Sequence, residues 1–413
     1  MASPARELLA LPDEILAEVL IRLPTLADLG RSCVACPAFR RVITRHSFLR
    51  RLRALRPPPL IGIPGVLHAP VIRAQPPHPC AAVARAFTDA DAVDFWCTFV
   101  PSPDRWRFRD FCDGRTLVSA VPEGSSARHS STRSDKYDPR GLVREFAVCD
   151  PVHRRYLLLP AIPDDLAASV HQEDFVEFEP FLDPSDEDQD GTSFRVICLA
   201  QCVTKLVVFS FSSRGGQWDA VAFDDWSTLT SGPGNPAPGF QSELACRCYA
   251  HGRFCWVMLW RNKLLMLNAR TVEFSSVDIT PIRPPPFRAV VEAAEGKIGM
   301  FTLCVEFEYG AYYLLYEILQ NDGQGATQWQ SEAIIPLPLD YRYTIMGVAG
   351  GYLLLQGIPE DLDSSPSSEK PNLDCFSLNL ETLQLEWFCE IKIMIIGAQL
   401  YAGFPPSLSA PTI

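Results

Sequence analysis

The N-terminal stretch Leu11–Leu52 places apolar and polar residues at the spacing of amphipathic helices. Apolar residues recur at three- and four-residue intervals near its start, which predicts a first helix; the stripe comprises Ile15, Leu16, Val19, Leu20 and Leu23. Pro12 suits the first helical position, because the N–H that proline lacks would be unpaired there. Pro24 ends this helix, since proline is not tolerated in a helix interior.

Two further helices and a final turn are predicted in the same stretch. Thr25 and Asp28 form a capping box that opens the second helix. Pro37 begins the third helix, and Ser47 caps a last short turn. These elements carry Leu26, Leu29, Cys33, Phe39, Val42, Ile43, Phe48, Leu49 and Leu52. Three short helices cannot cover so many apolar side chains, and a piece of this size rarely folds alone. The surplus apolar surface implies a partner.

Beyond Arg56 the pattern changes from helical to strand-like. Pro57–Pro59 prevent continuation of a helix and stiffen the chain, which predicts a boundary between a helical domain at 1–58 and a second domain at 59–413. From Leu60 onward no stretch has a convincing helical stripe, whereas short apolar or alternating runs recur between turn residues. The expected fold class is therefore α+β, and mainly β.

A repeated unit organises the second domain: an apolar strand, a short turn led by Asp or Asn, and a second strand. The clearest copies are Phe146–Asp150 with Tyr156–Leu159, Leu264–Asn268 with Val272–Val277, and Phe376–Asn379 with Leu383–Phe388. Weaker copies are Leu206–Phe211 with Trp218–Phe223, and Tyr312–Leu319 with Trp329–Ile335. Another strand pair precedes each copy, so the unit has four strands, which is typical of propeller blades.

Five such units are visible, and a ring needs a closing blade. Val66–Val100 and the C-terminal run Ile391–Ile396 are predicted to supply a sixth, composite blade. The expected architecture is thus a small three-helix N-terminal domain followed by an antiparallel β-propeller of about six blades. A pair of β-sandwiches is the main alternative for the second domain.

Charge and composition narrow the function classes. Residues 1–56 hold 10 Arg and 5 acidic residues, a net of +5, while the rest of the chain has a net of −17, which gives −12 in total. An acidic body argues against a nucleic-acid surface, because phosphate neutralisation needs the opposite sign. The chain has no secretory pattern and no membrane-spanning run, so its 14 cysteines are expected to be reduced thiols in the cytoplasm or nucleus.

The N-terminal stretch follows a recognisable succession: Leu11-Pro12-Asp13-Glu14-Ile15-Leu16, Val19-Leu20, Arg22-Leu23-Pro24, Leu29, Cys36, Phe39-Arg40, Ile43 and Ser47-Phe48. It resembles the F-box, the adaptor-binding module of SCF-type ubiquitin ligases. Phe39 stands where the family usually has Trp, and Pro37 where it has a basic residue. Phe keeps most of the apolar volume, so we expect adaptor binding to be weakened at most. An ordinary helical hairpin is the alternative interpretation.

The second domain resembles the kelch-like, F-box-associated propellers of large plant F-box families, with Cys149-Asp150-Pro151 and the strand Tyr156–Leu159 as the best match. These resemblances imply a non-catalytic substrate-recognition adaptor of a cullin–RING ligase. The F-box would dock onto the small adaptor subunit, and through it the cullin scaffold, while the propeller binds a target protein. The adaptor contact would be lined by Leu11, Pro12, Ile15, Leu16, Leu20, Leu23, Pro24, Leu29 and Phe39.

Three groups of residues have the composition of a metal or redox site, and a structural role is expected for each. Asp186, Asp188, Asp190 and Gly191 match the first half of a calcium loop, but Ile197 occupies the position of the bidentate Glu. The potential zinc ligands Cys246, Cys248, His251 and Cys255 lack the paired spacing of zinc knuckles, and Cys33 with Cys36 lacks a redox motif's strand–helix context. No metal or cofactor is predicted.

Signatures of catalysis are otherwise missing: there is no G-x-S-x-G elbow, phosphate loop or H-E-x-x-H motif. The Gly- and Pro-rich run Ser231–Pro236 is interpreted as a linker. Because propellers also host enzymes, the alternative function is a propeller-based enzyme or small-ligand sensor. A cluster of His and carboxylates in the central channel would favour that alternative. A broad aromatic and charged rim would favour the receptor.

Long inserts between strands are the expected places for target recognition, because loops at the rims of a propeller vary freely. They are Glu123–Arg140, Ala161–Gly191, Leu229–Leu244 and Glu360–Asn372, and at least one of the first two is expected to contribute to recognition. The first insert would give a basic surface with Arg128 and Arg133. The second would give an acidic surface that bears Phe175, Phe178 and Phe181. Disorder is the alternative interpretation for both.

Overall fold

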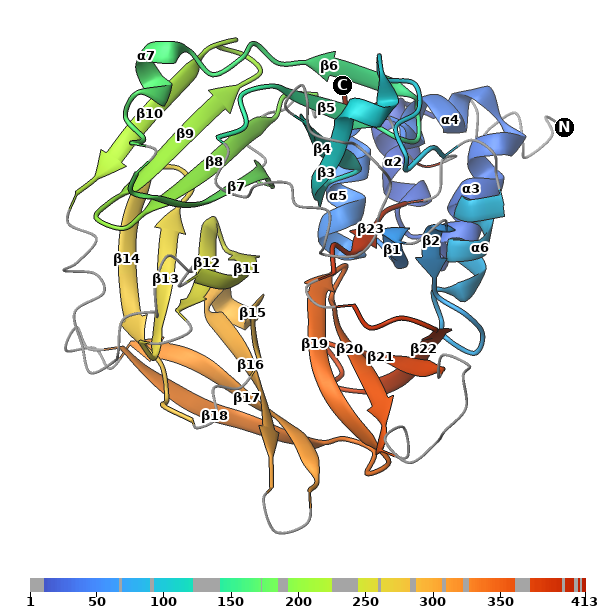
Figure 1. Cartoon of the computed structure of the whole chain (residues 1–413). Coiled ribbons are helices and arrows are strands. Elements are labelled where there is room, and N and C mark those ends of the chain that lie inside the picture. The colour runs from blue at the N-terminus through green and yellow to red at the C-terminus, as the bar shows by residue number, and fades with distance from the viewer. Residues whose placement is uncertain are drawn as a thin grey trace, which may run out of the picture.

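Antiparallel strands form a ring of blades around a central channel in the computed structural model (Figure 1). The structure describes residues 11–66, 69–89, 93–121, 142–171, 173–184, 192–224, 244–258, 261–282, 287–306, 310–321, 327–360, 372–395, 398–404, 408 and 411–413. Within these ranges the strands make five four-stranded sheets and one three-stranded sheet, which together form a six-bladed β-propeller. The predicted propeller is confirmed, and the β-sandwich alternative is wrong.

The N-terminal stretch is helical, as its spacing predicts. Its helices are α2 (Asp13–Leu20), α3 (Leu26–Ala35), α4 (Pro37–Ile43) and α5 (His46–Leu55). The Thr25 hydroxyl accepts the backbone N–H of Asp28 at 3.1 Å, so the predicted cap of the second helix is present. The last turn differs from the expectation, because residues 46–55 form a full helix. Residues 11–56 therefore contain four helices instead of three.

The four helices bury a small apolar core of their own. It comprises Leu16, Leu20, Ile21, Leu29, Cys33, Val42, Ile43, Phe48, Leu49 and Leu52, and it also includes Phe404 and Leu408 from the C-terminal tail. Salt bridges add to this packing at the surface. Asp13 of α2 accepts hydrogen bonds from Arg41 and Arg45, and Glu18 pairs with Arg51 of α5. The predicted boundary at Pro57–Pro59 therefore does not mark the end of the contacts made by the helices.

Five blades have four strands each. Blade 1 is β3 (Trp106–Cys112), β4 (Arg115–Ala120), β5 (Phe146–Asp150) and β6 (Arg155–Leu158). Blade 2 is β7 (Phe175–Asp183), β8 (Arg195–Cys202), β9 (Leu206–Ser212) and β10 (Trp218–Phe223). Blade 3 is β11 (Leu244–Ala250), β12 (Arg253–Met258), β13 (Lys263–Asn268) and β14 (Glu273–Asp278).

Blade 4 is β15 (Arg288–Glu292), β16 (Ile298–Val305), β17 (Tyr312–Asn321) and β18 (Thr327–Pro336). Blade 5 is β19 (Tyr341–Ala349), β20 (Tyr352–Pro359), β21 (Leu373–Asn379) and β22 (Leu385–Ile391). All five strand pairs predicted from the repeat are the third and fourth strands of these blades. The middle strands, such as β4 and β5, are buried along their whole length because each blade is covered by a neighbour on both faces.

The sixth blade is composite, as predicted, but only one of its three strands lies wholly within the predicted residues. It consists of β1 (Leu60–Val66), β2 (Ala69–Arg73) and β23 (Tyr401–Ala402), in the order β2-β1-β23. The predicted C-terminal run Ile391–Ile396 does not supply the closing strand, because Ile391 still pairs within β22 of blade 5. The chain therefore closes its ring about ten residues later than the apolar run suggested.

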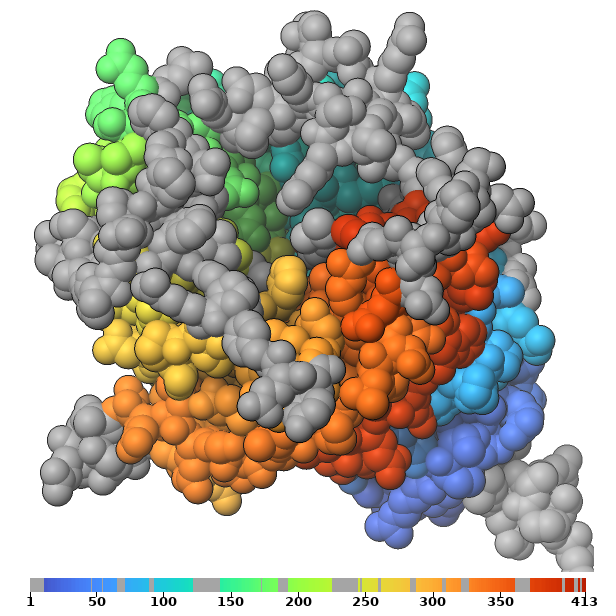
Figure 2. Space-filling view, turned by 60° about the horizontal axis from the view of Figure 1, so that its bottom comes forward, coloured from blue at the N-terminus to red at the C-terminus, as the bar shows by residue number. Residues whose placement is uncertain are grey.

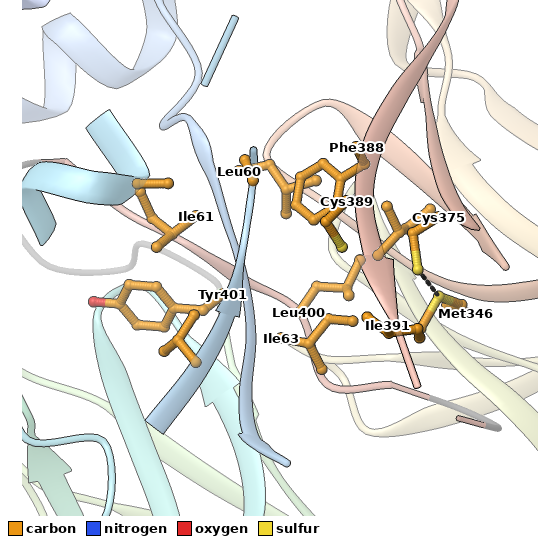
Figure 3. Packing of buried hydrophobic residues seen from close by; sticks show 14 of the residues in the cluster. Leu60, Ile61, Ile63, Met346, Cys375, Phe388, Cys389, Ile391, Leu400 and Tyr401 are labelled. Carbon is orange, nitrogen blue, oxygen red and sulfur yellow. Dashed lines mark hydrogen bonds between the residues drawn. The ribbon is translucent and has the colours of Figure 1, made fainter. Parts of the chain in front are cut away.

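The ring closure has its own apolar core. Leu60, Ile61 and Ile63 of β1 lie between Tyr401 on one side and Phe388, Cys389 and Ile391 of β22 on the other (Figure 3). Met346 of β19 and Cys375 of β21 belong to the same cluster, with their sulfur atoms 3.9 Å apart. Residues from both ends of the propeller sequence thus share one core with blade 5, which fixes the closure by packing as well as by strand pairing.

Two helices beyond Leu60 were not expected from the pattern. Helix α6 (Ala81–Asp89) packs on β1 and β2, and the short α7 (Asp164–Ala167) lies between blades 1 and 2. The signal for α6 is the helical spacing of Cys80, Ala84 and Phe87, all of which are buried. Two 3-10 turns, η1 (Pro103–Arg105) and η2 (Ala294–Gly296), complete the described helical elements.

The helices lie on one rim of the ring. Gly350 in the β19–β20 turn is so close to the linker that a Cβ there would lie 2.6 Å from the carbonyl oxygen of Pro58. The blue helices lie at the upper right of the ring in Figure 1 and at the lower right, near the red blade 5, in Figure 2. The turns between first and second strands therefore define the helix-side rim. The opposite rim carries the connections between second and third strands and those between blades.

Candidate functional site

The nine residues predicted to contact an adaptor do not share one environment. Leu16, Leu20 and Leu29 are buried in the helical core, with exposed fractions of 2%, 4% and 0%. Leu11, Leu23 and Phe39 are half-buried against the same core, while Pro12, Ile15 and Pro24 are exposed. The contact itself stays a prediction. A partner that docks without unfolding the helices would meet the exposed members first.

The most exposed apolar side chains of α2 are Ile15 and Val19, at 48% and 45%. They are four residues apart, so they lie one above the other on the same helix face. Asp13 and Glu18 are held by arginines of α4 and α5. The hydrogen bond from Arg41 lowers the pKa of Asp13, and the one from Arg51 lowers the pKa of Glu18. The apolar pair therefore occupies a helix on which Asp13 and Glu18 are held by neighbouring arginines.

The central channel is the largest cavity described, with a volume of about 1500 Å³. The first strand of each four-stranded blade lines it, together with the C-terminal segment that contains Leu400 and Tyr401. Its wall is apolar on the side of β19, where Ile345, Met346 and Val348 lie. Its wall is charged on the side of β3, β7 and β11. Among the described residues of the lining there is no histidine.

The charged side of the channel is an ion-pair network that joins three blades. Arg247 of β11 donates to Asp110 of β3 at 3.1 Å and to Glu179 of β7 at 2.8 Å, and its guanidinium lies 4.5 Å from the centre of the Phe181 ring. The indole N–H of Trp256 also donates to Glu179, at 2.8 Å. Asp110 further accepts the backbone N–H of Leu182. The network therefore fixes the inner strands of blades 1, 2 and 3 relative to one another.

Burial and charge act in opposite directions in this network. Burial raises the pKa of Asp110, although Arg247 opposes the effect. Burial alone would lower the pKa of Arg247, but Asp110 and Glu179 outweigh it and raise that pKa above its ordinary value. Arg247 therefore stays charged, and its single positive charge is shared between Asp110 and Glu179. Sequence reasoning missed this network, because its members share no motif and the Arg247–Asp110 contact alone spans 137 positions.

The structure separates most of the potential metal ligands. Cys248 and Cys255 face each other across β11 and β12, whereas His251 lies in the turn and its Nε2 contacts the carbonyl oxygen of Ala293 at 3.0 Å. The side chain of Cys246 and the calcium-like run Asp186–Gly191 lie outside the described residues. Within the described part of the chain, no group of three or more His, Cys, Asp or Glu residues could hold a metal ion.

The two cysteines of the helical stretch also have separate environments. Cys33 is buried in the helical core, and burial raises the pKa of its thiol. Cys36 is only partly buried and is the cap residue between α3 and α4.

One predicted recognition surface is wrong. Phe175, Phe178 and Phe181 were expected to project from an insert at the rim, but all three belong to β7, the innermost strand of blade 2, and are buried. The acidic residues between them had obscured the strand pattern. The rest of the predicted loop surface lies largely outside the described residues. It comprises 123–140 with Arg128 and Arg133, the predicted linker 231–236, and 185–191, 229–243 and 361–371 of the other inserts.

Comparisons with known proteins do not identify a family for this chain. No family model matches the chain, and no curated protein matches it. Among solved structures, the WD40 domain of SCAP from fission yeast has 9% identity and a TM-score of 0.32, with 73% of this chain and 74% of that chain covered. The tricorn protease has 8% identity and a TM-score of 0.30, with 69% and 30% covered. Scores this low carry no functional argument, so the fold assignment rests on the strand pairing itself.

Proposed function

We propose that this protein is the substrate-recognition adaptor of an SCF-type cullin–RING ubiquitin ligase, acting in the cytoplasm or nucleus. The helices would dock onto the small adaptor subunit, and the propeller would hold the target protein. Such a subunit makes and breaks no bond. It acts by proximity, because it raises the effective concentration of target lysines near the charged conjugating enzyme.

The observation that carries this proposal is the exposed apolar pair Ile15 and Val19 on α2. A single exposed apolar residue needs no explanation, but two on one helix face suit a partner that packs against that helix. Ile15 and Val19 also belong to the F-box-like succession at the start of the chain. The sequence resemblance and the exposed face therefore support the same partner.

The position of the strand ends supports a separate target surface. Three of the long inserts are flanked by strand ends that lie at the rim opposite the helices. These strand ends are Ala120 and Phe146, Phe223 and Leu244, and Pro359 and Leu373. That rim is free of the contact with the Pro58 linker. A target bound there would leave the apolar face of α2 available to the adaptor subunit.

The test is binding of the purified small adaptor subunit to the full chain. Burying an Ile or Val side chain contributes about 1.5–3 kcal/mol, and about half of each is available here. The double variant Ile15→Glu with Val19→Glu should therefore weaken binding by about a hundredfold, while circular dichroism stays unchanged. The side chains buried in the core, Leu16 and Leu20, are unsuitable for this test because their truncation would disrupt the helices.

Val34 provides the matched control. It is an even more exposed valine, at 81%, near the end of α3. Val34→Glu should bind the adaptor subunit like the unmodified chain. Equal binding by the unmodified chain and the double variant, or no binding by any of them, would contradict the proposed function.

A further inference from the structure

Three blades share the same turn between their third and fourth strands. In blade 3 the Oδ1 atom of Asn268 accepts the backbone N–H groups of Arg270 at 2.9 Å and Thr271 at 3.2 Å. In blade 5 the Oδ1 atom of Asn379 accepts those of Glu381 and Thr382, at 2.9 and 3.0 Å. A single side-chain oxygen is therefore enough to form this turn.

Blade 1 has an Asp at the corresponding position, and its second oxygen has a different role. The Oδ1 atom of Asp150 forms the same turn, with Val152 N at 3.1 Å and His153 N at 2.9 Å. The Oδ2 atom accepts the backbone N–H of Thr412 at 2.8 Å and its hydroxyl at 3.0 Å, and it also contacts His153 Nδ1 at 3.0 Å. An Asn here would place an amide donor against the N–H donor of Thr412. The backbone hydrogen bonds of the turn therefore need only Oδ1, while Oδ2 is engaged by Thr412 of the tail and by the His153 ring.

Thr412 has a second connection to blade 1. The Nε atom of Arg115, in β4, donates to the carbonyl oxygen of Thr412 at 3.1 Å. Asp150 has an exposed fraction of only 1%, so its hydrogen bonds to the tail are shielded from water. Charge-assisted hydrogen bonds in such a site are stronger than those between neutral groups.

The same tail contributes to the core of the helices. Phe404 and Leu408 are buried, at 4% and 0%, among Leu49, Leu52 and the other core residues of α2–α5. Gly403 donates to the carbonyl oxygen of Pro59 at 3.2 Å, directly after β23. The tail thus contacts the closing blade, the helical core and blade 1 within about ten residues.

We infer that the described residues of the C-terminal tail, Gly403, Phe404, Leu408 and 411–413, act as an intramolecular strap that completes the helical core and locks the helices onto blade 1, with Asp150 as its anchor. The strap holds the helices and the propeller in a fixed relative position. This inference does not depend on the identity of any partner. If the proposed function holds, the strap also fixes the distance between the adaptor and target surfaces.

Hydrogen exchange in the full chain, measured by mass spectrometry, tests the strap. The isosteric variant Asp150→Asn keeps the oxygen that the turn needs but loses the acceptor for Thr412. We expect exchange in peptides covering 411–413 and α5 to become at least about tenfold faster, because a charge-assisted hydrogen bond is lost. The control Asn268→Asp, at the equivalent turn of blade 3, should leave both peptides unchanged.

A variant of the tail itself separates loss of the strap from damage to blade 1. Thr412→Pro removes both hydrogen-bond donors without altering any strand and should accelerate exchange in α5 to a similar extent. Unchanged exchange in α5 for both Asp150→Asn and Thr412→Pro would overturn the inference. Faster exchange confined to β5 and β6 in Asp150→Asn would overturn it as well, since Asp150 would then serve only its own turn.

Discussion

At the scale of single residues, His78 is a buried titratable side chain, with an exposed fraction of 3%. Its side chain is buried between the composite blade and blade 5, where Nε2 lies 2.8 Å from the hydroxyl of Ser377 and Nδ1 accepts the backbone N–H of Cys80. Acceptance at Nδ1 places the proton of the neutral ring on Nε2, which donates to Ser377. Burial lowers the pKa of His78 to about 4, even though Glu386 lies 3.8 Å away. His78 is therefore neutral in the folded protein at physiological pH.

This environment predicts a loss of stability in acid. The unfolded chain binds a proton at His78 near pH 6.5, whereas the folded protein does so only near pH 4. The stabilisation is thus complete above pH 6.5 and falls as the pH decreases towards 4, by about 3 kcal/mol in the free energy of unfolding. Urea unfolding of the unmodified chain and His78→Gln, at pH 7 and pH 4, measures this. A stability difference between the two proteins that is the same at both pH values would contradict the assignment.

At the scale of elements, the turns between first and second strands show that a glycine at the same position can have different structural roles in two blades. Gly252 in blade 3 and Gly350 in blade 5 both have positive φ, at 77° and 58°. Nothing lies within 4 Å of a Cβ added to Gly252. A Cβ on Gly350 would clash with the carbonyl oxygen of Pro58 at 2.6 Å and with Ala402 at 2.9 Å. Gly252 is needed only for the conformation of its turn, whereas Gly350 also allows the linker and β23 to approach blade 5.

The two glycines form a matched pair for mutagenesis. Alanine at either position has the cost of a left-handed backbone, about 1–2 kcal/mol. Gly350→Ala has an additional steric cost of about 1–3 kcal/mol, so it should lower the midpoint of thermal unfolding clearly more than Gly252→Ala. Equal shifts would show that the linker does not pack against blade 5 as described.

At the scale of the whole molecule, the helices depend on residues far beyond the predicted boundary at Pro57–Pro59. The composite blade draws on Leu60–Val66 and Tyr401–Ala402, so residues 60–413 contain every strand of the ring. The helical core, in contrast, needs Phe404 and Leu408 from the other end of the chain. The dependence is therefore unequal: the propeller can close without the helices, but the helices lack part of their core without the tail.

Expression of fragments tests this asymmetry. Residues 60–413 should fold as a β-rich protein by circular dichroism, and should bind a hydrophobic dye because Phe404 and Leu408 lose their cover. The fragment 1–58 should remain largely unfolded, since it lacks these two side chains. A helical, cooperatively folded 1–58 fragment would contradict the asymmetry. A 60–413 fragment without β structure would contradict independent closure of the ring.

The sequence by itself determined the elements whose signals are local. Some elements depend only on residues within one turn or one hairpin, so a pattern of a few positions predicts them. They are the cap at Thr25, the helix start at Pro37, and the strand pairs joined by turns at Asp150, Asn268 and Asn379. Five blades follow from this, because each antiparallel sheet pairs strands that are neighbours in the sequence. The composite nature of the sixth blade was also predicted, because strand-like runs remained at both ends of the five repeated units.

Only the tertiary structure decided which residues close the ring, which helical leucines are buried and what anchors the tail. His78 meets Ser377 across 299 positions, and Asp150 meets Thr412 across 262. The local sequence pattern does not predict such contacts, because they depend on how the blades and helices are arranged in the folded chain. Phe175, Phe178 and Phe181 illustrate the same limit: acidic neighbours made them resemble a rim loop, whereas packing against adjacent blades makes them core. The physical reason is that burial is decided by the whole assembly, while propensity is decided by the nearest residues.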